Sequence, residues 1–251
     1  MKDKKVTRRK ALITGLAAVS GLHLPGCSKD LPPSYGNLLR MGDAFTYAAH
    51  RTLLPGQSLA REYSHKDITS FPAIGTIDPG GMDELDTSEA YRRLQSGAFA
   101  DWRLPIEGLV ARPGNYSLAD IKRLPPQTQI TRHTCEEGWS AIGEWTGVPL
   151  SRLLDAAGIL PTARFVTFYS FDGWADTLDM LDVLHPQTLL AYGMNGKDLS
   201  VSHGAPLRLR IETQLGYKSM KYLQRIVVGD AFDDGGELGH IQTGWSWYAG
   251  I

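Results

Sequence analysis

The sequence predicts an α+β domain with a mixed, β-rich sheet, and three observations support this fold class. Segments typical of strands are at least as frequent as segments typical of helices, and Asp-Gly and Asn-Gly turn pairs separate them. No internal repeat, low-complexity tract or Gly/Ser linker interrupts residues 41–251, so one domain is the simplest organisation. The 251 residues are 42% hydrophobic and 21% charged, which allows a substantial core and excludes disordered and fibrous classes.

Two short helices are predicted from their end signals. The first follows Ser117, a typical N-cap residue with Asp120 three positions later, and Pro125-Pro126 ends it. The second covers residues 149–157, where apolar residues recur on one face before Gly158.

Strand patterns predict the sheet. Residues 164–171 are rich in aromatic and β-branched side chains, residues 221–228 have a similar pattern, and residues 129–131 form a short strand-like run. In residues 207–212, Leu and Ile alternate with charged side chains, which places Arg208 and Arg210 on one face of a strand.

Residues 1–26 have the features of an export signal. Basic residues precede an uncharged, mostly apolar run, residues 11–24, that is too short to span a bilayer comfortably. Residues 7–12 (Thr-Arg-Arg-Lys-Ala-Leu) resemble a twin-arginine signal, and residues 24–27 (Leu-Pro-Gly-Cys) resemble a lipobox. We therefore expect a periplasmic protein that is anchored to a membrane by a lipid on Cys27, with residues 27–40 as a tether. The alternative is a conventional cleavage site beside an unmodified Cys27.

Charge argues against a nucleic-acid partner. Six of the 26 basic residues but only one of the 27 acidic residues lie in the first ten positions, so the remaining chain has a net charge of −6. No basic stripe is left to bind a phosphate backbone.

Several common catalytic motifs are absent from the sequence. It contains no Gly-x-Gly-x-x-Gly dinucleotide motif, no P-loop and no Gly-x-Ser-x-Gly. The seven histidines form no His-Glu-x-x-His pair, and no Cys-x-x-Cys-His could attach a haem. The acidic residues between Asp230 and Glu237 lack calcium-loop spacing and indicate a solvated loop.

Residues 132–140 (Arg-His-Thr-Cys-Glu-Glu-Gly-Trp-Ser) are the densest group of reactive side chains. Cys135 has three physical uses there: a buried apolar residue, a nucleophile, or a thiolate ligand to a soft metal. Arg132 and His133 favour the thiolate, whereas Glu136 and Glu137 disfavour it. A metal of high positive charge would remove that conflict.

This segment resembles the molybdopterin-binding domain of the sulfite oxidase family, and the resemblance extends over about residues 101–251 and more weakly from about residue 59. It implies that Cys135 is the one protein ligand to molybdenum, within a molybdenum-molybdopterin (Mo-pterin dithiolene) cofactor. The form Cys-x-Glu-x-Trp-Ser is more similar to the bacterial methionine sulfoxide reductase branch. It implies that Glu137 is a catalytic acid near the metal, with its pKa raised by a partly apolar pocket.

A second block, residues 203–208 and 216–221, resembles the pterin-binding segment of that family. The resemblance implies a set of cofactor-binding residues, namely His203, Arg208, Ser219, Met220, Lys221 and, at the end of a predicted strand, Ser170. Arg208 and Lys221 suit the cofactor phosphate, although taken singly each is also consistent with a solvent-facing strand residue. Residues 71–76 correspond to an early cofactor-contacting loop but have Ile74 where relatives often have asparagine, so no site is assigned to them. Trp139 and Trp145 are predicted to be core residues.

Together these features predict an exported molybdenum enzyme that transfers an oxygen atom with two electrons. Animal sulfite oxidases have an arginine five residues after the ligand cysteine, where this chain has Ser140. Reduction of an S-oxide or N-oxide is therefore favoured over oxidation of the sulfite oxyanion. Sulfite oxidation stays open as an alternative, because Arg132 and His133 could partly supply the missing charge. Without a haem motif, electrons must pass through a separate carrier, such as a membrane haem protein or a cytochrome. Without the extra C-terminal domain of dimeric relatives, we expect a monomer.

Two other functions compete with this one. The first is a non-catalytic, cofactor-binding lipoprotein. The second is a cysteine hydrolase that pairs Cys135 with His203 or His240, but it leaves the pattern of residues 203–221 unexplained.

Overall fold

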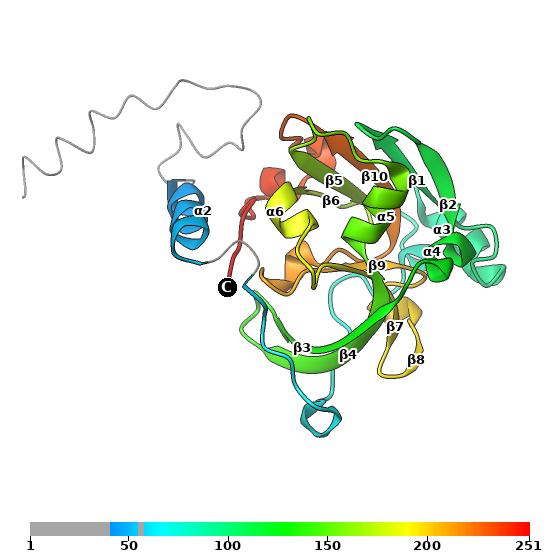
Figure 1. The fold of residues 1–251 in the computed structure, drawn as a ribbon. Helices are drawn as coiled ribbons and strands as arrows, with labels where there is room; N and C mark the ends of the chain where they lie inside the picture. The colour runs from blue at the N-terminus through cyan, green and yellow to red at the C-terminus, as the bar shows by residue number, and fades with distance from the viewer. Residues whose placement is uncertain (1–40, 55–57) are drawn as a thin grey trace, which may run out of the picture.

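The computed structural model describes residues 41–54 and 58–251, and two β-sheets dominate it (Figure 1). The export signal, lipobox and tether predicted for residues 1–40 lie outside the described residues. The mixed α+β, β-rich fold class is confirmed.

The first sheet is mixed. Its strands follow the order β2 (Gly114–Ser117), β1 (Arg103–Gly108), β10 (Leu223–Gly229), β5 (Phe165–Ser170) and β6 (Ala175–Asp179). The β1–β10 pair is parallel and the other pairs are antiparallel. The strands predicted over residues 164–171 and 221–228 correspond to β5 and β10.

The second sheet is antiparallel and contains the strands on either side of Cys135 and the strand that contains Arg208. Its strands are β3 (Gln127–Thr134), β4 (Ser140–Pro149), β7 (Leu189–Met194) and β8 (Lys197–Asp198), with β9 (Arg208–Arg210) paired to β7. Strands β3 and β4 form the long curved hairpin at the bottom of Figure 1. Residues 135–139 connect these two strands, so Cys135 is the first residue of the hairpin loop.

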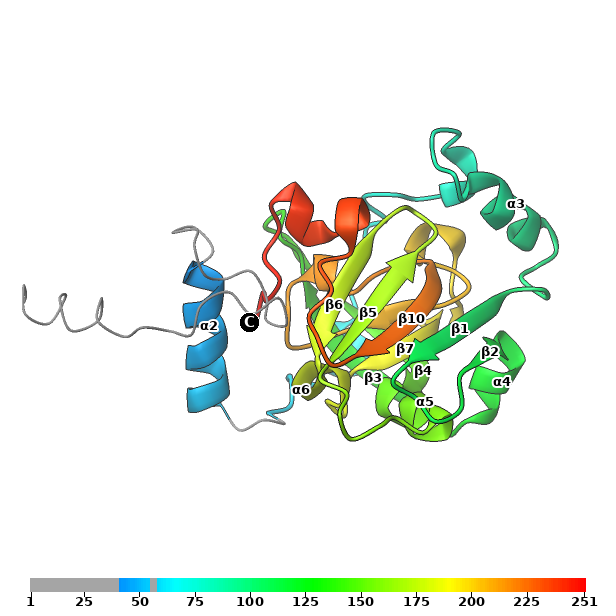
Figure 2. The ribbon, with the colours of Figure 1, turned by 90° about the horizontal axis from the view of Figure 1, so that it is seen from above.

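The helices are short and lie around the sheets (Figure 2). They are α2 (Met41–Leu53), α3 (Ser88–Ser96), α4 (Leu118–Arg123), α5 (Leu150–Ala157) and α6 (Met180–Val183). Both predicted helices are confirmed: a capping box of Ser117 and Asp120 begins α4, and left-handed Gly158 (φ 73°) ends α5. No helix within residues 41–54 and 58–251 is long and apolar enough to cross a bilayer.

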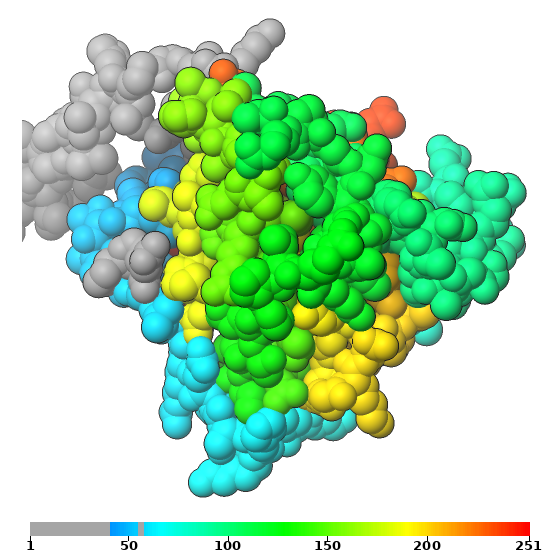
Figure 3. All heavy atoms as spheres, turned by 45° about the vertical axis from the view of Figure 1, so that its right-hand side comes forward, coloured from blue at the N-terminus to red at the C-terminus, as the bar shows by residue number. Residues whose placement is uncertain are grey.

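The segment that follows α2 crosses the outside of the second sheet. Tyr63 donates its backbone N–H to Ile130 of β3, and Thr69 donates to Ile142 of β4. This cyan segment occupies the lower end of the molecule in Figure 3. It continues into residues 71–76, which reach the cavity described below.

Strand β9 has the predicted alternation, but its charged face is buried. Arg208 and Arg210 are 4% and 0% exposed, so the solvent-facing alternative for Arg208 is wrong. Both guanidinium groups lie over Trp145, with Cζ atoms 5.0 Å and 4.5 Å from its ring centroid. Trp145 is fully buried, which confirms it as a core residue.

Candidate active site

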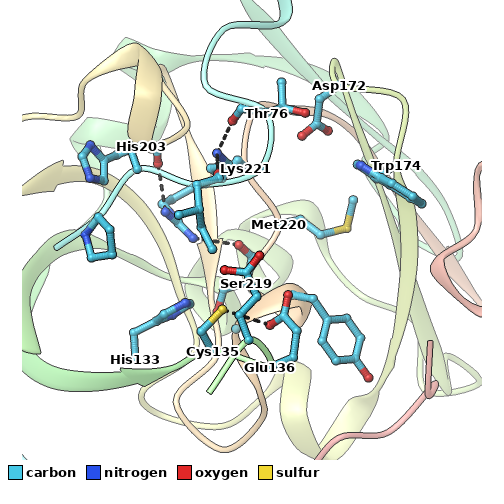
Figure 4. Close-up of a pocket in the computed structure, with 18 of the residues that line it drawn as sticks. Thr76, His133, Cys135, Glu136, Asp172, Trp174, His203, Ser219, Met220 and Lys221 are labelled. Atoms are coloured by element: carbon cyan, nitrogen blue, oxygen red, sulfur yellow. Dashed lines mark hydrogen bonds between the residues drawn. The ribbon is translucent and has the colours of Figure 1, made fainter. Parts of the chain in front are cut away.

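The hairpin loop of β3 and β4 forms one wall of a cavity of about 300 Å³ (Figure 4). The other walls come from residues 71–76, from residues 202–208 and 216–221, and from the C-terminal segment. The predicted site residues that line it are Cys135, Glu137, His203, Arg208, Ser219, Met220 and Lys221. Residues from three separate parts of the sequence therefore meet in one place.

Cys135 lies at the end of the cavity formed by the hairpin loop and is 4% exposed. Its backbone N–H donates to Trp139 O at 2.9 Å, and its carbonyl accepts from Gly138 N, which closes the loop. Its Sγ lies 3.5 Å from Glu136 Oε2. Burial, together with the neighbouring carboxylates of Glu136 and Glu137, raises the pKa of the thiol to about 11. The thiol therefore stays protonated until a cation binds to it.

The two acids differ in position. Glu136 is partly buried and contacts the sulfur, as Figure 4 shows. Glu137 also lines the cavity, but its side chain is exposed and accepts a hydrogen bond from Trp139 Nε1 at 3.1 Å. The partly apolar pocket expected for Glu137 is thus not found, and Glu136 is the acid in contact with Sγ. Trp139 lines the cavity and is only partly buried, so it is not the core residue that the sequence suggested.

Arg208 and Lys221 provide the positive charge of the cavity. Arg208 donates to the carbonyls of His203 and Ser219, both at 2.9 Å, while its buried Nε has no partner among the residues that the structure describes. Lys221 Nζ donates to the carbonyls of Ile74, at 2.9 Å, and of Thr76. Burial and the neighbouring Arg210 lower the pKa of Arg208 to about 9, and burial and the nearby Arg208 lower that of Lys221 to about 8. An anion bound here would relieve the repulsion between the two cations.

The other predicted cofactor-binding residues divide into two groups. His203, Ser219 and Met220 line the cavity. Ser170 is buried behind it and bonds Lys221 O at 2.6 Å and the Asp172 carboxylate. The predicted direct contact of Ser170 with the cofactor is therefore not supported, since Ser170 is not among the residues that form the wall.

His203 is held between two partners. Its Nδ1 lies 2.8 Å from Ser200 Oγ, and its Nε2 lies 3.3 Å from Phe71 O. Because burial lowers its pKa, this histidine is neutral, donating through Nε2 to the carbonyl and accepting at Nδ1.

A buried polar network stands behind the hairpin. Arg210 donates to Glu212 Oε2 and to His133 Nδ1, each at 2.7 Å, and Gln129 donates to Glu212 Oε1 at 2.9 Å. Burial and the two nearby arginines lower the pKa of His133 to about 2, so this ring is neutral. The possibility that Arg132 and His133 partly replace the missing sulfite-binding charge is not supported by their positions. Arg132 is exposed beside Tyr63, with its Cζ 5.6 Å from that ring centroid, and is not part of the cavity wall.

Several wall residues were not assigned from the sequence. They include the loop of residues 71–76, Asp172, Trp174, Tyr217 and Trp245. His240 also lines the cavity, although the sequence suggested it only as a base in a cysteine hydrolase. The loop is held by Lys221 and by Tyr222 Oη, which donates to Thr76 O at 2.9 Å. Its only local signal was its likeness to a cofactor-contacting loop.

The donor set fits the cofactor implied by the sequence. In the described part of the chain, no group of three or more His, Cys, Asp or Glu side chains could hold a metal. A metal at Cys135 would take one ligand from the protein and its other ligands from a bound group, as a pterin dithiolene provides. The buried Nε of Arg208, which has no partner within residues 41–54 and 58–251, offers a donor to a polar or anionic cofactor.

Comparisons with known proteins identify the class. The oxidoreductase molybdopterin-binding domain model matches residues 93–235, and the chain belongs to this family, which includes sulfite oxidase. It is a molybdopterin-dependent oxidoreductase.

Two relatives cover most of the chain. It is 32% identical over 244 residues to a putative protein-methionine-sulfoxide reductase subunit, YedZ1, of Azospira oryzae, covering 96% of this chain and 87% of the relative. It is 31% identical over 242 residues to the protein-methionine-sulfoxide reductase catalytic subunit MsrP of Xanthomonas axonopodis pv. citri, covering 89% of this chain and 71% of the relative.

A solved structure, the sulfane dehydrogenase SoxCD from Paracoccus pantotrophus, is 28% identical with a TM-score of 0.49. It covers 52% of this chain and 39% of that one.

The cysteine hydrolase alternative is not supported by the geometry. A nucleophilic cysteine needs a lowered pKa and a histidine within hydrogen-bond reach. The pKa of Cys135 is raised instead, and within residues 41–54 and 58–251 its side-chain partner is a carboxylate. His203 bonds Ser200 and Phe71, and His240 bonds Asp176.

Proposed function

We propose that this protein is the catalytic subunit of an exported molybdenum reductase that removes the oxygen atom from S-oxides, with the methionine sulfoxide side chain as substrate. The two relatives described above are named as subunits of protein-methionine-sulfoxide reductases, which supports this substrate class. N-oxides share the same chemistry and are the nearest alternative substrates.

The charge around Cys135 is the observation that carries the proposal. The Glu136 carboxylate contacts the sulfur, the Glu137 carboxylate lines the same end of the cavity, and the nearby His133 is neutral. The two cationic side chains of the wall, Arg208 and Lys221, already donate to backbone carbonyls. A sulfite dianion would meet like charge beside the metal ligand, whereas a neutral S-oxide would not.

The protein residues would divide the work as follows. Cys135 Sγ would hold the metal, while Arg208, Lys221, His203, Ser219 and Met220 would hold the pterin and its phosphate. When bound, the molybdenum-molybdopterin cofactor supplies a two-electron oxygen-atom transfer. Glu137, whose exposed carboxylate connects solvent to the cavity wall, would deliver protons from its carboxyl oxygen.

We further propose that the protein works in the periplasm, attached to a membrane by a lipid on Cys27, as a monomer paired with a separate electron carrier. A membrane haem protein or a cytochrome suits this role, and the relatives are named as subunits. Anchoring would concentrate the enzyme near a membrane-bound carrier.

The test is to purify the full chain from a host that makes molybdopterin. Molybdenum is measured by elemental analysis and pterin by the fluorescence of its oxidised form. We expect equimolar molybdenum and reduction of methyl p-tolyl sulfoxide by reduced benzyl viologen. Cys135→Ala is expected to lose both the metal and the activity, because the only protein ligand is gone.

Cys27→Ala serves as the matched cysteine control. It is expected to keep molybdenum and activity but to move from the membrane fraction to the soluble fraction. A protein that contains molybdenum but oxidises sulfite faster than it reduces sulfoxides would overturn the proposed direction. A Cys135→Ala protein that retains metal and turnover would overturn the proposed ligand.

A further inference from the structure

Four aromatic side chains form a continuous wall on one side of the cavity. Trp174 lies against His240, with ring centroids 4.7 Å apart, and Tyr217 contacts both His240, at 5.7 Å, and Trp245, at 4.9 Å. All four rings line the cavity. They come from the β5–β6 turn, from the 3₁₀ turn Gly216–Lys218 and from the C-terminal segment.

The wall leads from the surface to the interior. Trp245 is 37% exposed and Trp174 and Tyr217 are partly buried, whereas His240 is 8% exposed. A ligand that entered along this wall would pass aromatic faces before reaching the imidazole. Aromatic rings attract sulfur-containing and methyl groups, which suits the side chain of an S-oxide.

The imidazole of His240 is held from behind by buried charges. Its Nδ1 lies 3.0 Å from Asp176 Oδ2, and Asp176 Oδ1 accepts from Lys218 Nζ at 2.5 Å. Lys218 is fully buried and also donates to Trp247 O at 2.8 Å. The ion pair with Lys218 fixes the Asp176 carboxylate in place, and Asp176 Oδ2 in turn positions the ring through Nδ1.

The direction of the ring follows from these contacts. Because Nδ1 is paired with Asp176 and His240 lines the cavity, Nε2 is the ring nitrogen that remains for a ligand. Within the described part of the chain, no side chain or carbonyl is bonded to Nε2. A histidine held by a carboxylate at Nδ1, with Nε2 directed at a ligand space, is the arrangement that proton-transferring histidines use.

The aromatic wall adjoins the Cys135 loop. Gly216, next to Tyr217, packs so closely on the end of β3, just before that loop, that an added Cβ would collide with the His133 ring and lie 3.3 Å from Thr134 O. In Figure 4, Trp174 and Cys135 lie on opposite sides of Met220. A small ligand in the cavity can thus contact the aromatic wall while its reacting oxygen faces the region next to Cys135.

We propose that His240, positioned by Asp176 and Lys218, binds the oxygen of the S-oxide through protonated Nε2 and supplies one of the two protons consumed in its reduction. Trp174, Tyr217 and Trp245 would hold the alkyl groups on sulfur. The proposal rests on the proposed function and assigns a substrate-binding subsite to it. In the step, two electrons from the reduced carrier and two protons, one from His240 and one from Glu137, break the S–O bond and give a sulfide and water. Both groups are then reprotonated by the buffered solvent.

The first test compares His240→Phe with His65→Phe in the molybdenum-loaded enzyme. Phenylalanine preserves the stacking on Trp174 but carries no proton. His65 is a matched control because its side chain is 79% exposed and it is not part of the cavity wall. We expect kcat of His240→Phe to fall about 10²-fold, as is usual for loss of a general acid, with molybdenum content unchanged. The control is expected to keep the kcat of the wild-type enzyme.

Three further measurements separate a chemical role from a structural one. His240→Ala is expected to recover activity when millimolar imidazole is added, because the small base can occupy the vacated space. Trp174→Leu is expected to raise KM for methyl p-tolyl sulfoxide about fivefold with little change in kcat, in line with a lost sulfur–aromatic contact. Titration with the same sulfoxide, followed by tryptophan fluorescence, should show weaker binding to Trp174→Leu than to the wild type.

The outcomes distinguish this inference from the proposed function. If the wild-type enzyme reduces sulfoxides and His240→Phe retains its kcat and KM, the subsite is wrong and the proposed function stands. If His240→Ala is inactive with or without imidazole while its metal content is normal, the proton-donating role is wrong. If the wild-type enzyme binds molybdenum but reduces no sulfoxide, the proposed function fails. Sulfoxide binding that is the same in the wild type and Trp174→Leu would then reject the subsite as well.

Discussion

Replacing Arg210 with methionine is expected to destabilise the protein by about 3–5 kcal/mol, because it leaves a buried carboxylate without its partner. The side chains of Arg210 and Glu212 are 1% and 0% exposed, and their charged atoms are 2.7 Å apart. After the substitution, Glu212 keeps only the hydrogen bond from Gln129 Nε2, at 2.9 Å, among the side-chain contacts found for it. The buried negative charge would then be compensated by one neutral amide.

Thermal unfolding followed by circular dichroism measures the effect. For a domain of about 200 residues, 1 kcal/mol corresponds to about 2–4 °C in the melting temperature, so we expect a decrease of about 6–20 °C. The control is Arg225→Met, which removes an arginine that is 41% exposed and 3.7 Å from Glu107. Because a surface ion pair contributes about 0–1 kcal/mol, this variant should melt within about 4 °C of the wild type.

A double variant tests the reason for the loss. Arg210→Met combined with Glu212→Leu removes both charges, and we expect it to recover more than half of the stability lost in Arg210→Met. The reasoning would be refuted by an Arg210→Met protein that melts like Arg225→Met. It would also be refuted by a double variant that is no more stable than Arg210→Met alone.

Three further predictions concern the cavity. Glu137→Gln is expected to lower kcat about tenfold or more in the viologen assay, with normal molybdenum content. The control Glu89→Gln, on the exposed face of α3, should keep the kcat of the wild type. Equal turnover in the two variants would show that Glu137 has no catalytic role. Burial lowers the pKa of Lys221 to about 8, so this side chain loses its charge as the pH rises above 8. The affinity of metal-free protein for isolated molybdopterin should therefore decrease about tenfold between pH 7 and pH 9. Lys221→Arg should abolish that dependence, and a wild-type affinity that does not change with pH would contradict it. Gly216→Ala is expected to bind less molybdenum, because the added methyl group would collide with the His133 ring at the end of β3. Full metal content would show that the His133 ring can move aside.

Local signals were sufficient for the short helices. Helix α4 begins at a capping box that is visible in the sequence, and α5 ends at a glycine that adopts the left-handed conformation. Helix α3 was not predicted, because among its nine residues the only buried apolar side chain is Tyr91, and one apolar position gives no periodicity.

Strand β9 shows the limit of an alternating pattern. Alternation correctly predicted that Arg208 and Arg210 share a face, but it does not determine which face is buried. Their burial depends on Trp145, more than sixty residues away in the chain, and on Glu212, which supplies the opposite charge. Only the likeness to a pterin-binding segment placed Arg208 at the cofactor.

The site itself depends on contacts that no local pattern contains. Residues 71–76 reach the cavity because Lys221 and Tyr222, about 146 residues later, bond their carbonyls. The pairing of Asp176 with His240 likewise joins two segments separated by 64 positions. Glu136 and Glu137 are adjacent in sequence, and the tight turn that contains Gly138 (φ 90°) places the first against the sulfur and the second toward solvent.

The distribution of charge in the cavity connects the fold to the proposed reaction. The cations that suit a phosphate are Arg208, on β9, and Lys221, just before β10. The acids, Glu136 and Glu137, come from the β3–β4 loop. A thiol with a raised pKa beside two acids is a poor nucleophile but becomes favourable when a highly charged metal binds to it. The same acids then disfavour an anionic substrate and leave a neutral S-oxide as the ligand that this end of the cavity can accept.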